Sequence, residues 1–295
     1  MVTSVTYNNH MDLRTNKCGD YIVRMGKCAR TPHSFNQEAL NAARLIKEQA
    51  GEQDIWISYS GGIDSEFIIH TFLAAEIKFK VATAVMKHQE NAYDLEHSRK
   101  FCKLLGLPLH EVVIDINSFL ATELDHYATE TKCVSPQFPV HMKLWDQLDG
   151  FIVAGHGDPI FKRVNNIWMF NVQEKEDSVY RYAKWRNRNM APGFFAYTPE
   201  LLLSFILEKE VSNMFITGKS AKINDIIQIK HNVYSKYYNI SKREKKTGFE
   251  EINKLDDYYR NKLLTMFPDN NRKFSNPVEN LIDQLWPRID ETDEH

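Results

Sequence analysis

The residues best suited to chemistry form a short glycine-containing loop, Ser60-Gly-Gly-Ile-Asp-Ser65, between a predicted strand and a predicted helix. Gly61 and Gly62 lack a Cβ atom, so their backbone N–H groups can approach an anion closely. The first turn of the following helix adds unpaired N–H groups and the positive end of the helix dipole. Ser60 and Ser65 contribute hydroxyl donors. The spacing therefore predicts a site for a phosphate or pyrophosphate group.

Asp64 is the one residue of this loop that would repel a phosphate group. A carboxylate fits beside phosphates when it holds Mg²⁺, a hard cation that prefers oxygen ligands and bridges to phosphate. The sequence therefore predicts a catalytic, magnesium-holding Asp64. An ordinary Gly-Gly turn followed by a capping aspartate is the alternative interpretation. The loop is neither a Walker motif, which needs Gly-Lys-Ser/Thr, nor the G-x-G-x-x-G of a dinucleotide-binding fold.

The loop Ser60–Ser65 resembles the S-G-G-x-D-S pyrophosphate loop of the N-type ATP pyrophosphatases. That superfamily includes asparagine, GMP, NAD and argininosuccinate synthetases and 7-cyano-7-deazaguanine synthase, and the synthetase domain of asparagine synthetases is the most similar. The resemblance covers roughly residues 34–172 and implies a parallel α/β fold of the adenine nucleotide alpha hydrolase-like type. It also implies ATP and Mg²⁺ as cofactors, and cleavage of ATP to AMP and pyrophosphate.

The same resemblance assigns residues of this chain to the nucleotide. Contacts to ATP and its pyrophosphate are expected at the loop, at the end of the second strand, which lines the adenine pocket, and after the fourth strand. These residues are Ser58, Ser60, Gly61, Gly62, Ile63, Asp64 and Ser65; Val85, Met86 and Lys87; and Gly155, His156 and Gly157.

A second glycine motif, Gly155-His-Gly-Asp-Pro159, follows the fourth predicted strand. It falls at the carboxyl end of a parallel strand, where open α/β sheets bind ligands. Asp158 is expected to be a second Mg²⁺ ligand. The run Val153–Phe161 is similar to the S-G-E-G-x-D-E-L-F segment of asparagine synthetases, with His156 in place of the glutamate and Pro159 in place of the second acid. A strand-end turn whose aspartate bonds its own backbone is the alternative.

A basic stretch near the C-terminal end is the candidate source of a cation for the leaving pyrophosphate. Eight Lys and Arg residues stand between positions 219 and 246, against Asp225 and Glu244. Ser241–Phe249 resembles the R-x-K-x-x-F-like stretch near the end of the asparagine synthetase domain, which implies Lys245 or Lys246 as a catalytic phosphate contact. The alternative is that these cations lie on a solvated helix face.

The elements that would position these motifs alternate between strand and helix. Apolar strands are predicted at 55–59, 80–86, 109–114 and 151–154, with helices at 34–51, 64–73, 91–105 and 139–148. Such alternation predicts a doubly wound, mostly parallel α/β sheet covered on both faces. Further helices are expected from Thr198-Pro199 and at about 221–238, 249–264 and 277–286. We expect a β-hairpin extension (1–33), an ATP-binding α/β domain (34–172) and a helical substrate or cap region (173–295).

Composition limits the class of protein. The 295 residues are 43% hydrophobic and 26% charged, as in an ordinary globular chain, and the net charge is −2. The chain as a whole is therefore not a nucleic-acid-binding polycation. No apolar run approaches the roughly 20 residues of a membrane helix, so no membrane partner is expected. The four scattered cysteines predict free thiols in a reducing cytoplasm rather than a disulfide or zinc scaffold.

One segment of the sequence is compatible with a nucleic-acid partner. Cations and aromatic residues interleave there, namely Arg181, Lys184, Arg186 and Arg188 with Tyr180, Tyr182 and Trp185. Surfaces that stack nucleic-acid bases have this pattern. The rim of a substrate cleft or plain protein surface would explain it equally well.

The sequence as a whole predicts a Mg·ATP-dependent adenylating ligase of the amide-synthetase type. A carboxylate or carbonyl oxygen of a small-molecule acceptor would attack the α-phosphorus, and an amine or ammonia would then displace AMP. No Ser-His-Asp or Cys-His pattern was found, in keeping with catalysis by positioning and charge stabilisation. Two alternatives stay open, a nucleic-acid base modification enzyme using the same adenylation and a non-catalytic ATP- or AMP-binding module. The acceptor, the nitrogen source and assembly as a homo-oligomer are left undecided.

Overall fold

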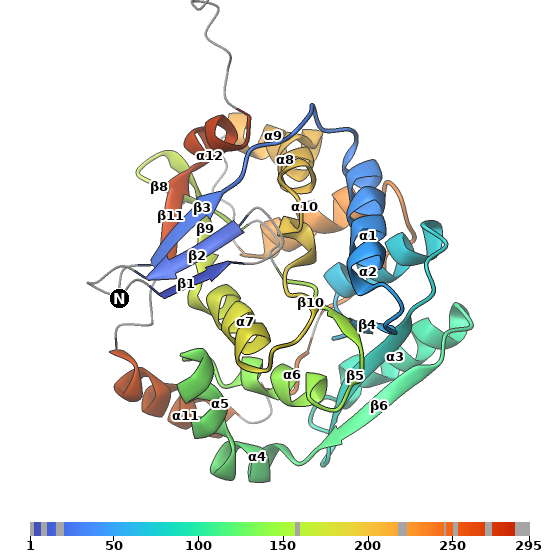
Figure 1. Ribbon diagram of the computed structural model, residues 1–295, viewed down its shortest axis with the longest axis vertical. Coiled ribbons are helices and arrows are strands. Elements are labelled where there is room, and N and C mark those ends of the chain that lie inside the picture. Colours follow the sequence, from blue (N-terminus) through green and yellow to red (C-terminus); the bar gives the residue numbers. More distant parts are fainter. Residues whose placement is uncertain are drawn as a thin grey trace, which may run out of the picture.

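The computed structural model describes residues 3–6, 11–15, 21–156, 160–217, 223–244, 246–249, 253–268 and 273–286 of the 295-residue chain. Figure 1 shows strands gathered into sheets, with helices packed around them. Within these ranges, no helix combines the length and the apolar character needed to cross a membrane.

A five-stranded sheet forms the centre of the molecule, and all of its neighbouring strands are parallel. Its order is β10-β7-β4-β5-β6. The strands are β4 (Ile55–Ser58), β5 (Lys80–Met86), β6 (Leu109–Ile114), β7 (Phe151–Val153) and β10 (Met190–Ala191). The chain starts in the middle at β4, winds outward through β5 and β6, and then returns to β7 and β10 on the other side of β4. The expected doubly wound parallel sheet is therefore confirmed.

Alternate side chains of these strands enter two separate apolar clusters, one on each face of the sheet. Ile55 and Ile57 belong to one cluster, whereas Ala82 and Ile152 belong to the other. Because strand side chains alternate between the two faces, short and almost wholly apolar strands supply both cores at once.

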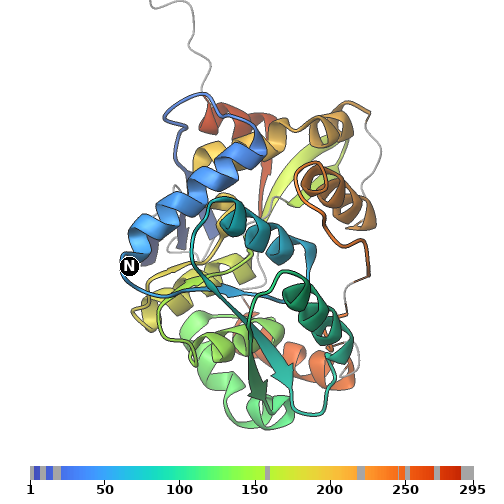
Figure 2. The ribbon, with the colours of Figure 1, turned by 90° about the vertical axis from the view of Figure 1, so that its right-hand side faces the viewer.

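Helices cover both clusters. The helices that contribute to the cluster of Ile55 include α1 (Phe35–Ala50), α2 (Ile63–Ala74), α3 (Ala92–Leu104) and α8 (Pro199–Leu207). Four pack mainly on the opposite face, namely α4 (Ile116–Thr122), α5 (Leu124–Thr131), α6 (Gln137–Trp145) and α7 (Glu174–Trp185). Figure 2 shows the blue helix α1 in the upper part of the molecule and the green helices in the lower part.

Helix ends follow local signals in the sequence. Ser34 caps α1 by accepting from the N–H of Gln37, and Gly51 at φ +55° ends that helix. Thr198 caps α8, and Pro199 occupies its first turn. A side-chain oxygen satisfies an N–H group that has no partner within the helix, and glycine adopts positive φ without steric cost. The predicted starts of both helices are thus confirmed.

Two three-stranded antiparallel sheets lie outside the central one. The first contains β1 (Thr3–Thr6), β2 (Met11–Thr15) and β3 (Tyr21–Met25), where the sequence predicted a hairpin extension. The second contains β8 (Ile160–Val164), β9 (Ile167–Gln173) and β11 (Lys273–Pro277). The apolar run 167–172 therefore pairs with a strand from near the C-terminal end, a partner that periodicity by itself does not identify.

The C-terminal half is otherwise mostly helical, as expected. It contains α9 (Lys209–Thr217), α10 (Ile223–Tyr234), α11 (Asn253–Met266) and α12 (Val278–Leu285). Between α10 and α11 the chain returns to the carboxyl edge of the central sheet without regular structure. We call residues 239–244 and 246–249 of this connection the strap.

Candidate functional site

The Ser60–Ser65 loop leaves the carboxyl end of β4 and leads directly into α2. Gly61 has φ +71°, a left-handed backbone that suits glycine. Gly62 is the N-cap residue of α2 and provides no side-chain cap. The Ser65 hydroxyl donates to the Gly62 carbonyl oxygen at 2.9 Å and holds the turn closed. The first turn of α2 therefore has the arrangement of a helix end that accepts an anion.

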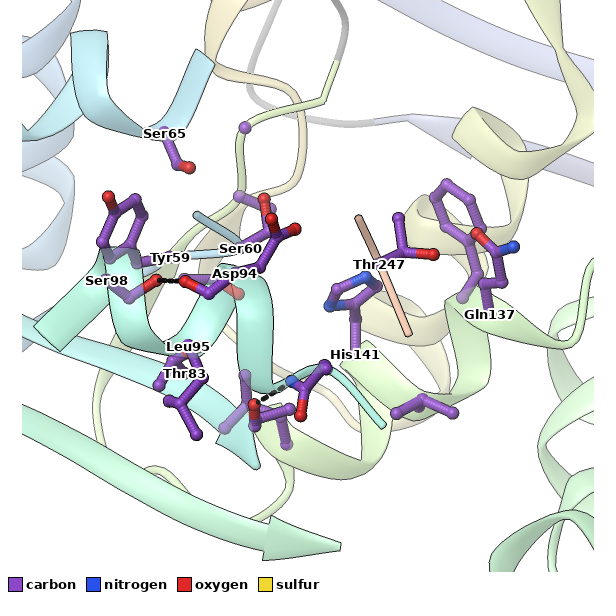
Figure 3. A pocket seen from close by; sticks show the side chains of 18 of the residues that line it. Tyr59, Ser60, Ser65, Thr83, Asp94, Leu95, Ser98, Gln137, His141 and Thr247 are labelled. Atoms are coloured by element: carbon purple, nitrogen blue, oxygen red, sulfur yellow. Dashed lines mark hydrogen bonds between the residues drawn. The ribbon is translucent and has the colours of Figure 1, made fainter. Parts of the chain in front are cut away.

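A cavity of about 270 Å³ lies beside this loop. Sites that enclose small ligands span roughly 300–1,000 Å³, so this cavity is near the lower end of that range. Figure 3 shows Ser60, Ser65 and Asp94 on one side of it, and Gln137, His141 and Thr247 on the other. Of the predicted nucleotide contacts, seven line the cavity, namely Ser58, Ser60, Asp64, Ser65, Met86, Gly155 and His156.

The second glycine motif lies against the first loop. β4 and β7 are parallel neighbours, so the chain leaves both strands at the same edge of the sheet. A Cβ atom placed on Gly155 would lie 3.8 Å from the backbone nitrogen of Ser65. The winding of the sheet reverses between β4 and β7, and open α/β sheets bind ligands at such a point. Gly157 and Asp158 lie outside the described residues, so their roles stay predictions.

Asp64 is bonded to two side chains of α10. Lys230 Nζ lies 2.6 Å from Asp64 Oδ1, and the Tyr234 hydroxyl donates to the same oxygen at 2.8 Å. The Lys230 side chain is 8% exposed, so this ion pair is poorly screened by water. Tyr234 is itself held by a stacked ring, that of Phe67, with 4.6 Å between ring centres. The position of the Asp64 carboxylate is therefore set by α10.

This ion pair bears on the predicted magnesium site. The Lys230 ammonium and the Tyr234 hydroxyl already engage Asp64 Oδ1 and would compete with Mg²⁺ for that oxygen, so magnesium binding by Asp64 stays a prediction. Among the described residues, no three His, Cys, Asp or Glu side chains come together as a metal site. Lys230 instead supplies a cation beside the phosphate loop. The sequence analysis counted this lysine in the basic stretch but favoured Lys245 or Lys246.

The strap is bonded to the loop and to α2 and α3. Arg243 donates to Asp94 Oδ1 at 2.8 Å and also to the carbonyl oxygen of Gly61. The Ser241 N–H donates to Glu66 Oε2 at 3.0 Å. Asp94 and Glu66 are 4% and 0% exposed, so both are charge-assisted bonds shielded from water. The strap thereby closes the cavity and fixes the backbone at Gly61.

The two lysines predicted as phosphate contacts are placed differently. The Lys246 N–H donates to Asp94 Oδ1 at 3.0 Å, and its ammonium lies 5.1 Å from the ring centre of Tyr93. Lys246 does not line the cavity, whereas Thr247 and Phe249 of the strap do. Lys245 lies outside the described residues. Its predicted phosphate contact stays a prediction.

Glu66 connects several elements behind the loop, and the sequence analysis missed it. Its Oε1 lies 2.5 Å from His97 Nε2 and accepts from the Tyr59 hydroxyl at 3.3 Å. Burial raises the pKa of Tyr59 far above its usual range, and the negative charge of Glu66 raises it further. Tyr59 therefore stays a neutral donor to Glu66 at any ordinary pH.

The end of β5 forms the part of the cavity expected to hold adenine. Thr83, Ala84 and Met86 line it. The Asn91 amide donates to the Ala84 carbonyl oxygen at 2.8 Å, and its oxygen accepts from the Met86 N–H at 3.0 Å. This side chain therefore holds the strand end in a fixed shape next to the cavity.

Two residues assigned to the adenine pocket do not line the cavity. The Lys87 ammonium pairs with Asp115 at 2.8 Å near the protein surface. Val85 stands between Ala84 and Met86 on β5, and it is absent from the cavity lining. The cavity reaches the strand end that the resemblance indicated, although Val85 and Lys87 of that strand end do not line it.

An aromatic wall faces the loop from the other side of the cavity. It consists of Phe138, His141 and Trp145 of α6, together with His156. The ring centre of His156 lies 5.0 Å from that of Phe138 and 6.3 Å from that of Trp145. Trp145 is anchored, since its Nε1–H donates to Ser58 Oγ at 2.9 Å. The signal available in the sequence was the spacing of three and then four residues between positions 138, 141 and 145, which puts them on one helix face.

The interleaved basic and aromatic segment is engaged within the protein. Tyr182 is fully buried and donates to Asp146, which also pairs with Arg186 at 2.5 Å. Arg181 pairs with Asp177 at 2.5 Å, and Arg188 donates to backbone carbonyl oxygens. These side chains therefore stabilise the packing of α7 and are not arranged as a base-stacking surface.

Comparison with known proteins gives no sequence-level match and several partial structural ones. No protein-family model and no curated protein sequence matches the chain. An NH3-dependent NAD synthetase from Campylobacter jejuni overlaps with a TM-score of 0.33 at 14% identity, over 81% of this chain and 95% of that one. A glutamine-dependent NAD+ synthetase from Acinetobacter baumannii, in complex with ADP, overlaps with a TM-score of 0.35 at 13% identity. The overlap covers 85% of this chain and 50% of that one. A tRNA thiolase from Methanococcus maripaludis overlaps with a TM-score of 0.31 at 12% identity. The overlap covers 82% of this chain and 86% of that one.

At these TM-scores the overlaps are partial. The functional conclusion therefore depends on the loop, the cavity and the side chains of this chain.

Proposed function

We propose that this protein is an AMP-forming ligase of the ATP pyrophosphatase type, which adenylates an acceptor oxygen and then replaces AMP by an amine. One observation carries the proposal. At the switch point of the sheet, the Gly61-Gly62 turn and the side-chain-free N-cap of α2 lead to Asp64, which lines the cavity and pairs with the buried Lys230. Each of these features favours bound phosphate, and together they suit a leaving pyrophosphate.

The pyrophosphate end of ATP would bind at the loop. First-turn N–H groups of α2 and the hydroxyl of Ser60 would donate to its oxygens, while the Ser65 hydroxyl donates to the Gly62 carbonyl oxygen and keeps the turn in shape. ATP would arrive as its magnesium complex, and the metal would be part of the substrate. Lys230 would neutralise charge that grows on the leaving group, held in position by its ion pair with Asp64. A cation in a poorly hydrated site stabilises such charge far better than one in water.

The adenine ring would lie at the end of β5. Ala84 and Met86 give that part of the cavity an apolar surface, and Thr83 adds a hydroxyl. The Asn91 bridge keeps the strand end from rearranging when the ring binds. This arrangement would place the α-phosphorus between the two glycine loops, with the aromatic wall opposite.

The chemistry then needs positioning more than a reactive side chain. The acceptor oxygen attacks the α-phosphorus, the bond to the β-phosphate oxygen breaks, and pyrophosphate leaves. An amine nitrogen next attacks the activated carbon, the carbon–oxygen bond breaks, and AMP leaves. The described cavity lining contains no cysteine, so a covalent thioester with a lining residue is not part of this scheme. Holding the reactants in line accounts for much of the rate.

The test is product analysis with ATP labelled at the α-phosphate, incubated with candidate acceptors and ammonium. Labelled AMP and pyrophosphate are expected. Lys230→Met should lower the rate by about 10²- to 10³-fold, the usual effect of removing one preorganised charge-stabilising donor. Lys236→Met is the matched control, because Lys236 pairs with Glu208 at 2.6 Å and with Glu210, neither of which belongs to the Ser60–Ser65 loop or lines the cavity. ADP and orthophosphate as products, or an unchanged rate in Lys230→Met, would refute the proposal.

The same experiment separates the two alternatives. Tight ATP binding with no AMP under any acceptor would indicate the non-catalytic binding module. AMP formation that appears only with a nucleic acid, and weakens steeply with salt, would indicate the base modification enzyme.

A further inference from the structure

We propose that the aromatic wall binds the acceptor, and that the acceptor is a planar, uncharged heteroaromatic ring whose ring carbonyl oxygen is adenylated. An aliphatic amino-acid carboxylate does not suit this wall. The inference depends on the proposed function and specifies its substrate class.

The first observation is the clustering of rings at one end of the cavity. Phe138, His141 and His156 are partly exposed, whereas the Trp145 ring beneath them is 1% exposed. Ring centres of His141 and His156 lie 6.5 Å apart, and those of His141 and Trp145 lie 6.4 Å apart. Ring faces of this kind bind flat ligands by stacking and give little to an aliphatic chain.

The second observation is the charge of the cavity. None of the described residues that line it is a lysine or an arginine, and the nearest cations, Lys230 and Arg243, are already paired with Asp64 and Asp94 of the lining. A bound dicarboxylate would need cationic partners for its second carboxylate, since an unpaired charge in such a cavity is costly. A neutral ring needs only hydrogen bonds, and Gln137 at the same end offers both an amide donor and an acceptor.

The third observation is the position of the wall. His156 directly follows Gly155. A Cβ atom placed on Gly155 would lie 3.8 Å from the backbone nitrogen of Ser65. One end of the wall therefore starts at the phosphate loop. Figure 3 shows His141 and Gln137 across the cavity from Thr83 and Leu95, the side on which the adenine is expected. A ring on the wall and an adenine at β5 can thus flank the α-phosphate.

The reaction balances for a ring lactam. The lactam oxygen attacks the α-phosphorus, the α–β phosphoanhydride bond breaks, the ring N–H proton is lost, and pyrophosphate leaves. The product is a ring imidate bearing AMP on oxygen. Ammonia or an amine then adds to that carbon, the carbon–oxygen bond breaks with its electron pair going to AMP, and the nitrogen loses a proton. The net change is replacement of a ring oxygen by nitrogen.

The experiment measures binding to protein saturated with α,β-methylene-ATP, which cannot be cleaved between the α- and β-phosphates. Ligand-detected NMR titrations compare uridine and hypoxanthine with L-aspartate and L-glutamate. At least one ring compound should bind tenfold or more tightly than either amino acid. Phe138→Leu should weaken that binding at least fivefold, as expected when one stacking face is lost, and should leave the affinity for the ATP analogue within twofold. Tyr258→Leu, which removes a 63% exposed ring of α11, is the control.

Several results would overturn the inference. They are tighter binding of an amino acid, no binding of any ring compound, or an equal loss in Tyr258→Leu. A matching loss of the ATP analogue in Phe138→Leu would show that the wall holds adenine instead. Failure of wild-type protein to bind the analogue would instead refute the proposed function itself. A thermal melt checks that Phe138→Leu is folded, and Phe138→Tyr should retain ring binding. A short oligonucleotide titrated in parallel shows whether the ring is bound free or within a nucleic acid.

Discussion

Replacing Gly61 by alanine tests whether the phosphate loop depends on glycine for its shape alone or also for its contacts with the strap. Gly61 has φ +71°, and an added Cβ atom would lie 3.0 Å from Arg243 Nη2 and 3.1 Å from both the Asp94 carbonyl oxygen and Ser98 Oγ. Gly106 has a nearly equal φ of +66°, yet a Cβ atom there would meet nothing within 4 Å. The two substitutions share the backbone strain and differ in the contacts.

The magnitudes follow from these geometries. Placing a non-glycine residue in the left-handed region costs about 1–2 kcal/mol, which applies to both variants. At Gly61 the crowding also displaces Arg243, which donates to the Gly61 carbonyl oxygen. Loss of a hydrogen bond to a charged group costs about 1.5–3 kcal/mol. The backbone cost is shared, so only the lost hydrogen bond separates the two variants. Gly61→Ala should therefore be less stable than Gly106→Ala by about 1.5–3 kcal/mol.

Urea unfolding curves measure this difference, and calorimetric titration with an ATP analogue measures its effect on the site. Only Gly61→Ala should bind the analogue more weakly, because only there is the first turn of α2 shifted. Equal losses of stability in the two variants would show that the strap does not depend on contact with Gly61. Unchanged nucleotide affinity in Gly61→Ala would refute the assignment of this loop to phosphate.

Three further substitutions test the surroundings of the loop. Lys230→Met removes the ammonium group that pairs with Asp64, so Mg²⁺ alone should bind to the variant more tightly than to the wild type. Calorimetry without nucleotide measures both affinities. Equal affinities would show that Lys230 does not compete with Mg²⁺ for Asp64. Glu66→Gln weakens the charge-assisted bond from the Ser241 N–H, which should lower the free energy of unfolding in urea by about 1–3 kcal/mol. The backbone amides of the strap should then exchange hydrogen faster. Unchanged protection from exchange would show that Glu66 does not hold the strap. Burial lowers the pKa of His70 below its ordinary value of 6.5. The unfolded chain then binds more protons than the folded one, so stability should fall as the pH drops below about 6.5, and His70→Phe should reduce that fall.

The local features of the site were predictable because they depend on neighbouring residues. Ser60–Ser65 contains its own turn-forming glycines and lies between an apolar strand and a helix, so its place at a sheet edge followed from the sequence. The resemblance to the pyrophosphate loop also directed attention to the end of β5, where Met86 does line the cavity. The direction of individual side chains there was less certain, as Lys87 shows by pairing with Asp115.

The strand β9 illustrates a second limit. It was not among the predicted strands, and its partners are β8 and β11 and not the central sheet. A strand pattern encodes which faces are apolar and contains no direct record of which distant segment supplies the hydrogen bonds. The same limit applies to the basic stretch, where charge alone could not rank Lys230 above Lys245 and Lys246.

By itself, the amino-acid sequence determined the Gly61-Gly62 turn between β4 and α2, the alternation that makes a doubly wound sheet, and the ends of helices such as α1 and α8. Each of these is fixed by residues only a few positions apart, through backbone preferences, capping and side-chain periodicity. Only the tertiary structure decided that α10 places Tyr234 on Asp64, 170 positions away, and that the strap reaches Gly61 across 182 positions. Such contacts depend on how whole helices pack, and packing is decided by the summed fit of two apolar cores rather than by any local pattern.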